Sequence, residues 1–270
     1  MTYFCVVEEK KPLNEMQESL SKGLIKLVKS LNMKKFRDEY NLFMGEGPKV
    51  VDDLLRSFDC KVLIATASYL SSRRNVCAET VVKVSDADLK RVSLLKSPHE
   101  VVAVFRKPMN KPLPIDVNAL CMGLDDVQDP GNVGTIVRLA DWFGIEQIYA
   151  SHHTADVFSP KVVQATMGAL ARVRVEYVDL PLFLSSLPSQ LPIMGTFLEG
   201  DNVYESKLPA NGILIMGNEG NGISEAVGKL VTQRLHIPNF PQGRLTSESL
   251  NVAIATAIVC SEFRRRIMKR

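Results

Sequence analysis

The sequence lacks several features that would place it in a familiar class. No apolar run reaches the roughly 20 residues that a membrane-spanning helix needs, and the N-terminus has neither the basic region nor the long apolar stretch of a secretory signal. The 5 cysteines are odd in number, scattered and never spaced C-x-x-C. These absences argue against a membrane protein, a metal site and a disulfide framework, and they favour a protein of the reducing cytoplasm.

Length and charge distribution say more than net charge does. A chain of 270 residues is long for one core, so two domains are expected. Residues 1–110 hold 19 Lys and Arg against 14 Asp and Glu, a balance of +5, whereas residues 111–270 hold 14 against 16, a balance of −2. A polyanion would favour the positive half, although an ordinary solvated surface explains the same charges. The candidate RNA contacts are Lys34, Lys35, Arg37, Arg73 and Arg74.

A proline-rich stretch marks the predicted boundary between the two halves. Residues 107–114 hold three prolines in eight positions and no apolar periodicity, which is typical of a linker. The predicted organisation is an N-terminal extension over 1–19, a small α/β domain over 20–106, a linker over 107–117 and a larger domain over 118–270.

Apolar patterning predicts the elements of both halves. In the first half it predicts a helix within 20–36, a helix over 49–58 that Pro48 opens, and strands at 42–44, 61–67 and 101–105. In the second half it predicts strands at 120–124, 147–150, 173–178, 193–197, 213–216 and 235–237, with helices at 133–143, 160–171, 223–230 and 250–266. Such alternation indicates a mostly parallel sheet covered on both faces, with ligands at the carboxyl ends of its strands.

The first motif, D-P-G-N-V-G-T-I-V-R, follows the strand that ends at Leu124. Asn132 is expected to cap the next helix through its side-chain oxygen. Arg138 then comes about a turn and a half into that helix, where it can bind an anion or pair with a carboxylate. The alternative is an ordinary capped helix with a solvated Arg138 paired to Asp141.

The second motif, M-G-N-E-G-N-G-I-S, runs from Met216 to Ser224 and has three glycines in six positions. Glycine at this density is unfavourable unless the backbone must approach something closely or adopt positive φ. Glu219 lies among these glycines and needs a partner if buried, for which Arg138 is the candidate. The alternative is a flexible turn capped by Ser224. The motif has neither the Lys-Ser/Thr pair of a phosphate-binding loop nor the position of a dinucleotide fingerprint.

The third motif combines I-P, at Ile237, with S-L-N-V-A, which starts at Ser249. Ser249 or Asn251 is expected in the first turn of the last helix, where free N–H groups and side-chain amides can meet a carboxylate or an adenine edge. A capped, apolar core helix is the simpler alternative. The terminal F-R-R-R-I-M-K-R is expected to be a solvated helix end.

In this order the three motifs resemble the SpoU (TrmH) family of RNA ribose 2′-O-methyltransferases, in the SPOUT superfamily. The stretch K-K-F-R-D-E-Y-N-L-F-M-G-E-G-P-K-V-V is similar to the L30e/L7Ae-like substrate-binding domain that precedes the catalytic domain in ribosomal-RNA members. One departure is the segment I-P-N-F-P-Q-G-R-L-T-S-E, in which the loop 239–248 looks longer than usual.

The resemblance implies a fold and a chemistry. The fold would be a trefoil-knotted, parallel-sheet α/β domain after a small L30e-like α/β domain, working as a homodimer on RNA with S-adenosyl-L-methionine and no metal. Ribosomal RNA is the expected substrate; the alternatives are transfer RNA or a non-catalytic RNA-binding or assembly protein. The implied catalytic residues are Asn132, Arg138, Glu219 and Asn251. The implied cofactor contacts are Thr196, Gly217, Asn218, Gly222, Ile237, Ser249 and Leu250.

The family resemblance makes Arg138 the general base, but an arginine pKa above about 12 disfavours that role. We expect Arg138 to orient the ribose hydroxyl and stabilise the developing oxyanion, with the proton relayed through a substrate phosphate. Glu219 would hold the guanidinium, and Asn132 would complete the hydrogen bonding.

Overall fold

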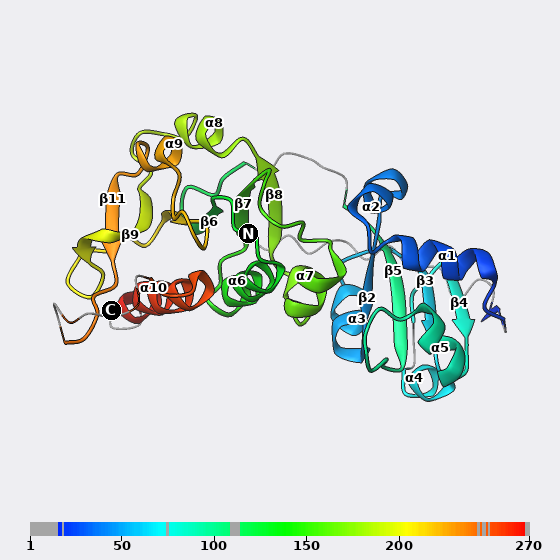
Figure 1. The fold of residues 1–270 in the computed structure, drawn as a ribbon. Coiled ribbons are helices and arrows are strands. Elements are labelled where there is room, and N and C mark those ends of the chain that lie inside the picture. The colour runs from blue at the N-terminus through cyan, green and yellow to red at the C-terminus, as the bar shows by residue number, and fades with distance from the viewer. Residues whose placement is uncertain are drawn as a thin grey trace. The chain divides into compact units, whose positions relative to one another are not determined.

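The computed structural model describes residues 16–17, 19–73, 76–108, 114–241, 244, 247 and 249–267 (Figure 1). Arg74, most of the predicted N-terminal extension, the middle of the predicted linker and half of the loop 239–248 lie outside the described residues. The chain forms two compact units. The first is Met1–Met109 with Phe158–Gln164, and the second is Asn110–Val157 with Ala165–Arg270.

The first unit is built on a mixed five-stranded sheet of order β1-β4-β3-β5-β2, in which β5 runs antiparallel to β3 and β2. Its strands are β1 (Met16–Gln17), β2 (Leu42–Glu46), β3 (Cys60–Ala65), β4 (Thr80–Lys83) and β5 (Val101–Arg106). Its helices are α1 (Lys22–Ser30), α2 (Lys34–Tyr40), α3 (Pro48–Leu54), α4 (Ala67–Ser71) and α5 (Asp86–Val92), with most of α7 (Pro160–Ala165).

Helices cover both faces of this sheet. On one face α1 and α5 bury Val28 and Leu89 in a single apolar core with alternate strand residues such as Met44. On the other face lies α3, because a Cβ atom at Gly45 would come within 2.8 Å of the Leu54 side chain. The side-chain alternation of β2 therefore separates two cores within the unit.

The predicted helix within 20–36 is confirmed as α1, but it is not continuous through this stretch, because α1 ends at Ser30 and α2 begins at Lys34. Arg37 explains the break. Its guanidinium donates to the carbonyl oxygens of Leu31 at 2.8 Å and Asn32 at 2.9 Å, at the C-terminal end of α1. Helix-end carbonyls have no partner within their own helix, so this buried arginine satisfies them and fixes the turn.

The second unit is built on a six-stranded, fully parallel sheet of order β11-β9-β10-β6-β7-β8. Its strands are β6 (Leu120–Leu124), β7 (Gln147–Ser151), β8 (Arg174–Val178), β9 (Ile193–Asn202), β10 (Gly212–Met216) and β11 (Gln233–His236). All six predicted strands and the parallel α/β class are thus confirmed, and β9 continues past the predicted end at Phe197.

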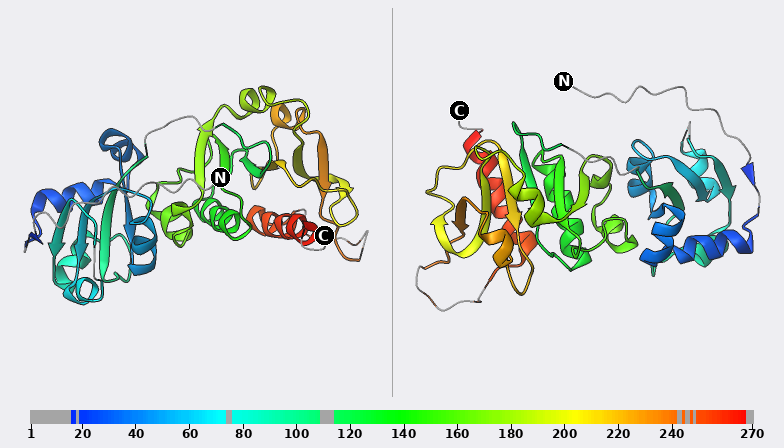
Figure 2. Two further views of the ribbon diagram at one scale, coloured as in Figure 1. Left: turned by 180° about the vertical axis from the view of Figure 1, so that it is seen from behind. Right: turned by 90° about the horizontal axis from the view of Figure 1, so that it is seen from above.

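The helices of the second unit cover both faces of its sheet (Figures 1 and 2). One face carries α8 (Leu180–Ser185) and α9 (Glu225–Gly228), which share a core with β6, β7, β9 and β10. The other carries α6 (Pro130–Trp142) and α10 (Val252–Ile267), which lie side by side in Figure 2. The predicted helix 160–171 is interrupted, because Met167 and Gly168 have φ of 52° and 93° between α7 and the short helix Ala169–Ala171. No helix within the described ranges is long and apolar enough to cross a membrane.

Candidate active site

The candidate site lies where the loops after β6 and β10 meet. These two strands are neighbours in the sheet, and the chain continues from β6 toward β7 and β8 but from β10 toward β11. Loops that diverge in this way leave a crevice at the carboxyl ends of the strands, which is where parallel sheets bind ligands. The first two sequence motifs form these two loops.

Two aspartates after β6 hold the loops together. The backbone N–H of Asp125 donates to the carbonyl of Met216 at 2.9 Å, and its carboxylate accepts from the N–H of Ser224 at 2.7 Å. Asp126 has φ of 55°, and its carbonyl accepts a 2.7 Å hydrogen bond from the Asn218 side chain. A left-handed aspartate is uncommon and persists because several contacts fix it. Neither aspartate belongs to the three motifs, although two carboxylates directly after a buried strand are a sequence signal for this edge of the sheet.

The glycines of the second motif serve different purposes. At Gly217 a Cβ atom would lie 2.3 Å from the carbonyl carbon of Gly222, so the loop itself requires glycine there. Gly222 has φ of 70° and exchanges backbone hydrogen bonds of 2.8 and 3.0 Å with Asn218. Gly220 has neither constraint, since the nearest atom to its Cβ position is 3.6 Å away. Gly220 and Gly222 therefore have open space on the Cβ side, whereas Gly217 has none.

Glu219 sits at the N-terminal end of α6. Its carboxylate accepts hydrogen bonds from the N–H groups of Gln128 at 3.2 Å and Asp129 at 3.1 Å, and from the Asn132 side chain at 2.9 Å. Partial burial works against the charge, but these hydrogen bonds together hold the pKa of Glu219 below its ordinary value. The predicted pairing with Arg138 is wrong, because free N–H groups at a helix start are the nearer partners of a carboxylate.

Asn132 connects all three motifs. It was predicted to cap α6, but Asp129 is the cap residue, with its carboxylate accepting from the Asn132 N–H at 2.8 Å. The Asn132 side chain instead donates to Glu219 and accepts a 3.0 Å hydrogen bond from the Asn251 amide. The Asn251 oxygen in turn caps the first turn of α10 at 2.9 and 3.3 Å. Asn132, Glu219 and Asn251, three of the implied catalytic residues, are thus joined by hydrogen bonds.

Arg138 stands apart from this chain of side chains. It is exposed on α6, and it makes no hydrogen bond or ion pair with any residue that the structure describes. Six residues of helix place it about 9 Å along the axis from Asn132 and on a different side. Asp141, its alternative partner, pairs with Arg172 through two 2.8 Å hydrogen bonds. The Arg138 guanidinium is therefore unpaired within the part of the chain that the structure describes.

The remaining predicted cofactor contacts lie on β9, after β11 and before α10. Thr196 is half-buried in β9 and donates weakly to the sulfur of Met216 at 3.9 Å. Ile237 is half-buried after β11, whereas Ser249 and Leu250 are exposed just before α10. No hydrogen bond among the described residues joins these four positions to the Asn132 group.

The predicted RNA contacts of the first unit are mostly engaged with the protein. Arg37 is only 2% exposed and caps α1, so its predicted RNA contact is wrong. Arg73 forms a double hydrogen bond with Asp52 and lies 4.3 Å over the Tyr69 ring. Lys34 pairs with Asp38. Lys35 is exposed, and Arg74 lies outside the described residues.

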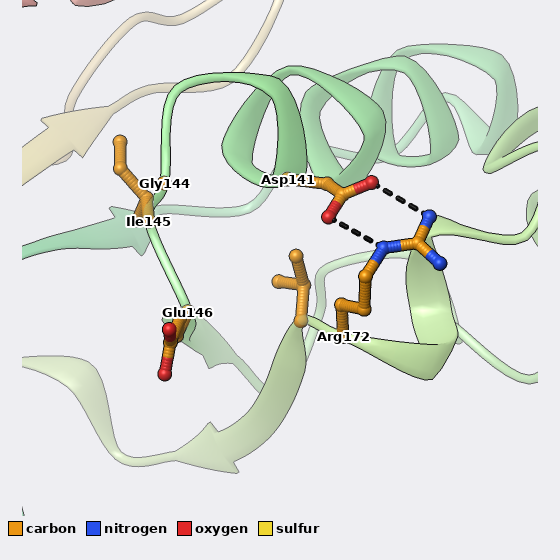
Figure 3. A pocket seen from close by; sticks show the side chains of 6 residues that line it. Asp141, Gly144, Ile145, Glu146 and Arg172 are labelled. Atoms are coloured by element: carbon orange, nitrogen blue, oxygen red, sulfur yellow. Dashed lines mark hydrogen bonds and ion pairs between the residues drawn. The ribbon is translucent and has the colours of Figure 1, made fainter. Parts of the chain in front are cut away.

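A separate pocket of about 300 Å³ lies at the other end of α6 (Figure 3). It contains the Asp141–Arg172 pair, Gly144 and Glu146. Glu146 directly precedes β7, so this pocket is at the amino ends of the strands. Its main charges neutralise each other, and it lies at the edge opposite to the one where parallel sheets bind ligands.

These features define an α/β domain whose candidate site lies at the switch point of a parallel sheet, together with a small α/β unit. The chain belongs to the SpoU rRNA methylase family, which matches residues 119–261. Residues 22–103 match the MRM3-like substrate binding domain. The resemblance inferred from the motifs is confirmed.

Relatives share the whole two-unit architecture. The 23S rRNA (guanosine(2553)-2′-O)-methyltransferase RlmP of Bacillus subtilis is 29% identical over 92% of this chain and 98% of its own. A TrmH-family structure from Porphyromonas gingivalis superposes with a TM-score of 0.84 at 45% identity, covering 92% of this chain and 99% of that one. The AdoMet-bound rRNA methyltransferase of Sinorhizobium meliloti gives 0.78 at 28%, covering 94% and 98%.

Proposed function

We propose that this protein transfers a methyl group from S-adenosylmethionine to a ribose 2′-hydroxyl of ribosomal RNA. The observation that carries the proposal is the hydrogen-bonded chain Asn251–Asn132–Glu219, which joins the three family motifs at the ligand edge of the sheet. Family membership and the rRNA 2′-O-methyltransferase relative support both the reaction and the substrate class.

The residues at this edge fit S-adenosylmethionine. The open backbone at Gly220 and Gly222 leaves room for a ligand that side chains would exclude. Thr196 and Asn218 supply polar groups, and the exposed Leu250 supplies an apolar surface for an adenine ring. We propose that these positions, with Gly217, Ile237 and Ser249, hold the cofactor, whose sulfonium supplies an activated methyl group.

Arg138 is proposed as the catalytic residue that meets the RNA. A ribose hydroxyl is a weak nucleophile, so transfer depends on in-line positioning and on help with its proton. A guanidinium with free donors can bind the hydroxyl oxygen and an adjacent phosphate together, stabilising negative charge as it develops. Asn132, Glu219 and Asn251 act on the loop shape rather than on the guanidinium.

We further propose that the chain works as a homodimer of trefoil-knotted catalytic domains in the cytoplasm, where ribosomal RNA is modified. Exposed apolar side chains on α6 and α10 support the dimer: Trp142 is 83% exposed and Ile254 53%. Aromatic residues such as tryptophan are enriched at protein interfaces relative to the rest of the protein surface. Sedimentation of the purified protein should give twice the chain mass, and Ile254→Glu should shift it toward the monomer.

The central test supplies purified protein with S-adenosylmethionine carrying a labelled methyl group and with RNA from cells that lack this gene. Label is expected in ribosomal RNA, at one ribose that resists alkaline cleavage after modification. Label in transfer RNA would select the alternative substrate. Cofactor-free binding of RNA, with no calorimetric signal for S-adenosylmethionine, would identify a non-catalytic RNA-binding protein and overturn the proposal.

A further inference from the structure

Helix α1 of the first unit carries a stripe of lysines. Lys22, Lys26 and Lys29 are spaced i, i+4 and i+7, which places them on one side of the helix, and all three are exposed. None of them forms a hydrogen bond or ion pair within the described ranges of the chain. We call these three residues the α1 lysine stripe.

The charge at the start of α1 works against the stability of the helix, whereas Lys29 in its last turn is favourably placed. The helix has no acidic residue in its first turn, where negative charge is favourable, and Lys22 is its first residue. The lysines also repel one another at i, i+4 and i+3 spacing, and no carboxylate of α1 offsets this. If only helix stability mattered at these positions, acidic residues would be expected in the first turn of α1 and among its lysines.

Helix α5 shows that difference within the same unit. It packs into the same apolar core as α1, yet Asp86 and Asp88 occupy its first turn and Lys90 and Arg91 its last. Arg91 also pairs with Asp88 at 2.9 Å. The neighbouring helix thus follows the rule that α1 breaks, so the α1 lysine stripe is a local feature rather than a general excess of cations.

The other cations that sequence patterning offered as RNA contacts are largely occupied. Arg37 is buried at the end of α1, and Arg73 is bound to Asp52. Asp38 forms ion pairs with both Lys34 and Lys107. A surface that binds a polyanion needs cations that are not already paired with carboxylates of the protein, because such cations are available to neutralise phosphates. The α1 lysine stripe provides such cations.

We propose that the α1 lysine stripe is the surface through which the first unit binds the phosphate backbone of the RNA substrate. The inference rests on the proposed function. Lysine is a mobile point charge on a long stem, so this surface would hold RNA without selecting a base sequence. Its contribution should therefore appear in affinity and salt dependence, and in KM, with little effect on kcat.

The test replaces all three lysines by glutamine, in Lys22→Gln/Lys26→Gln/Lys29→Gln. Glutamine matches lysine in helix propensity, so α1 should persist, which circular dichroism and thermal unfolding can verify. The matched control, Lys49→Gln/Arg56→Gln/Lys161→Gln, removes the same charge from exposed positions on α3, just after it and on α7. Helix α3 lies on the opposite face of the sheet from α1.

The measurement is binding to deproteinised ribosomal RNA, from cells lacking the gene, between 50 and 300 mM salt, which are roughly the concentrations where counterion release dominates. The slope of log K against log salt is negative, and each lost phosphate contact makes it shallower by about 0.7 for single strands. The slope of the stripe variant should therefore be shallower than that of the wild type by about 2. The slope of the control should change less than half as much. Calorimetry should give both variants wild-type affinity for S-adenosylmethionine.

Two results would overturn the proposal. One is a stripe variant with the wild-type slope and affinity, and the other is an equal loss in stripe variant and control, which would show a response to net charge alone. Failure of the proposed function has a different signature: the wild-type protein itself would neither bind S-adenosylmethionine nor label ribosomal RNA.

Discussion

The side-chain amide of Asn251 donates a 3.0 Å hydrogen bond to the side-chain oxygen of Asn132, which lies 119 positions earlier in the chain. The amide nitrogen of the same Asn132 side chain donates a hydrogen bond to the Glu219 carboxylate. A primary amide can donate and accept at once, so the Asn132 side chain bridges a carboxylate and a second amide. The start of α6, the loop after β10 and the start of α10 are thereby fixed relative to one another.

This bridge predicts strong coupling between the two asparagines. Asn132→Ala removes both hydrogen bonds, whereas Asn251→Ala removes one of them. In a double-mutant cycle on methyl transfer, the double variant should be less impaired than the sum of the single losses, by about 1 kcal/mol, as for residues of one hydrogen-bond network. Additive losses would show that the two side chains act independently.

Arg138→Ala should lower methyl transfer by roughly two orders of magnitude or more, the scale of losing a group that positions the nucleophile or stabilises an oxyanion. Cofactor affinity measured by calorimetry should change little, because the loss is realised mainly in the transition state. Arg138→Lys should rescue poorly, since an ammonium does not reproduce a forked donor. Near-normal turnover by the lysine variant would show that only a nearby positive charge is required.

The glycine loop gives a test of cofactor approach. Gly217→Val should disrupt the fold of the loop itself, because the added Cβ meets the backbone of Gly222 at 2.3 Å. Gly220→Val has open space in the protein and should leave the thermal midpoint near wild type while lowering affinity for S-adenosylmethionine tenfold or more, by about 1.4 kcal/mol. Undiminished affinity in Gly220→Val would place the cofactor away from this loop.

The sequence predicted the class of the fold and the set of site residues, because these depend on local patterns and motifs. Strand–helix alternation predicted the parallel sheet. The family resemblance selected Asn132, Glu219 and Asn251 as site residues, and hydrogen bonds join them in the structure. Local periodicity could not show where a side chain would find its partner. Glu219 was expected to bind Arg138, but it accepts hydrogen bonds from the backbone N–H groups of Gln128 and Asp129. Because every residue except proline has a backbone N–H group, the pattern of side chains in the sequence does not reveal such partners.

The same limit applies to arginines at helix ends. Arg37 looked like a surface cation, but it satisfies carbonyls at the end of α1, and its burial depends on a turn that periodicity does not reveal. The expectation of a solvated arginine run at the end of α10 was also wrong. Arg264 donates to the carbonyl oxygens of Phe143 at 2.6 Å and Gly144 at 3.1 Å, at the end of α6.

The two arginines that follow Arg264 pair with Glu262, and this pairing should make the stability of the protein depend on acid pH. Arg265 above all, and Arg266 with it, hold the pKa of the buried Glu262 at about 2, below its usual 4.5, although burial opposes this. Because the folded pKa is lowered, the stabilisation is fully present above about pH 4.5 and is lost as the pH falls through about 2.

Glu262→Gln keeps the shape of this side chain and removes its charge. A shift of this size corresponds to roughly 3 kcal/mol, and the partial exposure of both arginines reduces the expected loss to about 2 kcal/mol at pH 7. Urea unfolding of wild type and variant across this pH range should give curves that converge as the pH falls below about 4, because the wild-type carboxylate is then increasingly protonated. A difference that stays constant down to pH of about 2 would show that the carboxylate charge contributes nothing and that Glu262 acts through its packing alone.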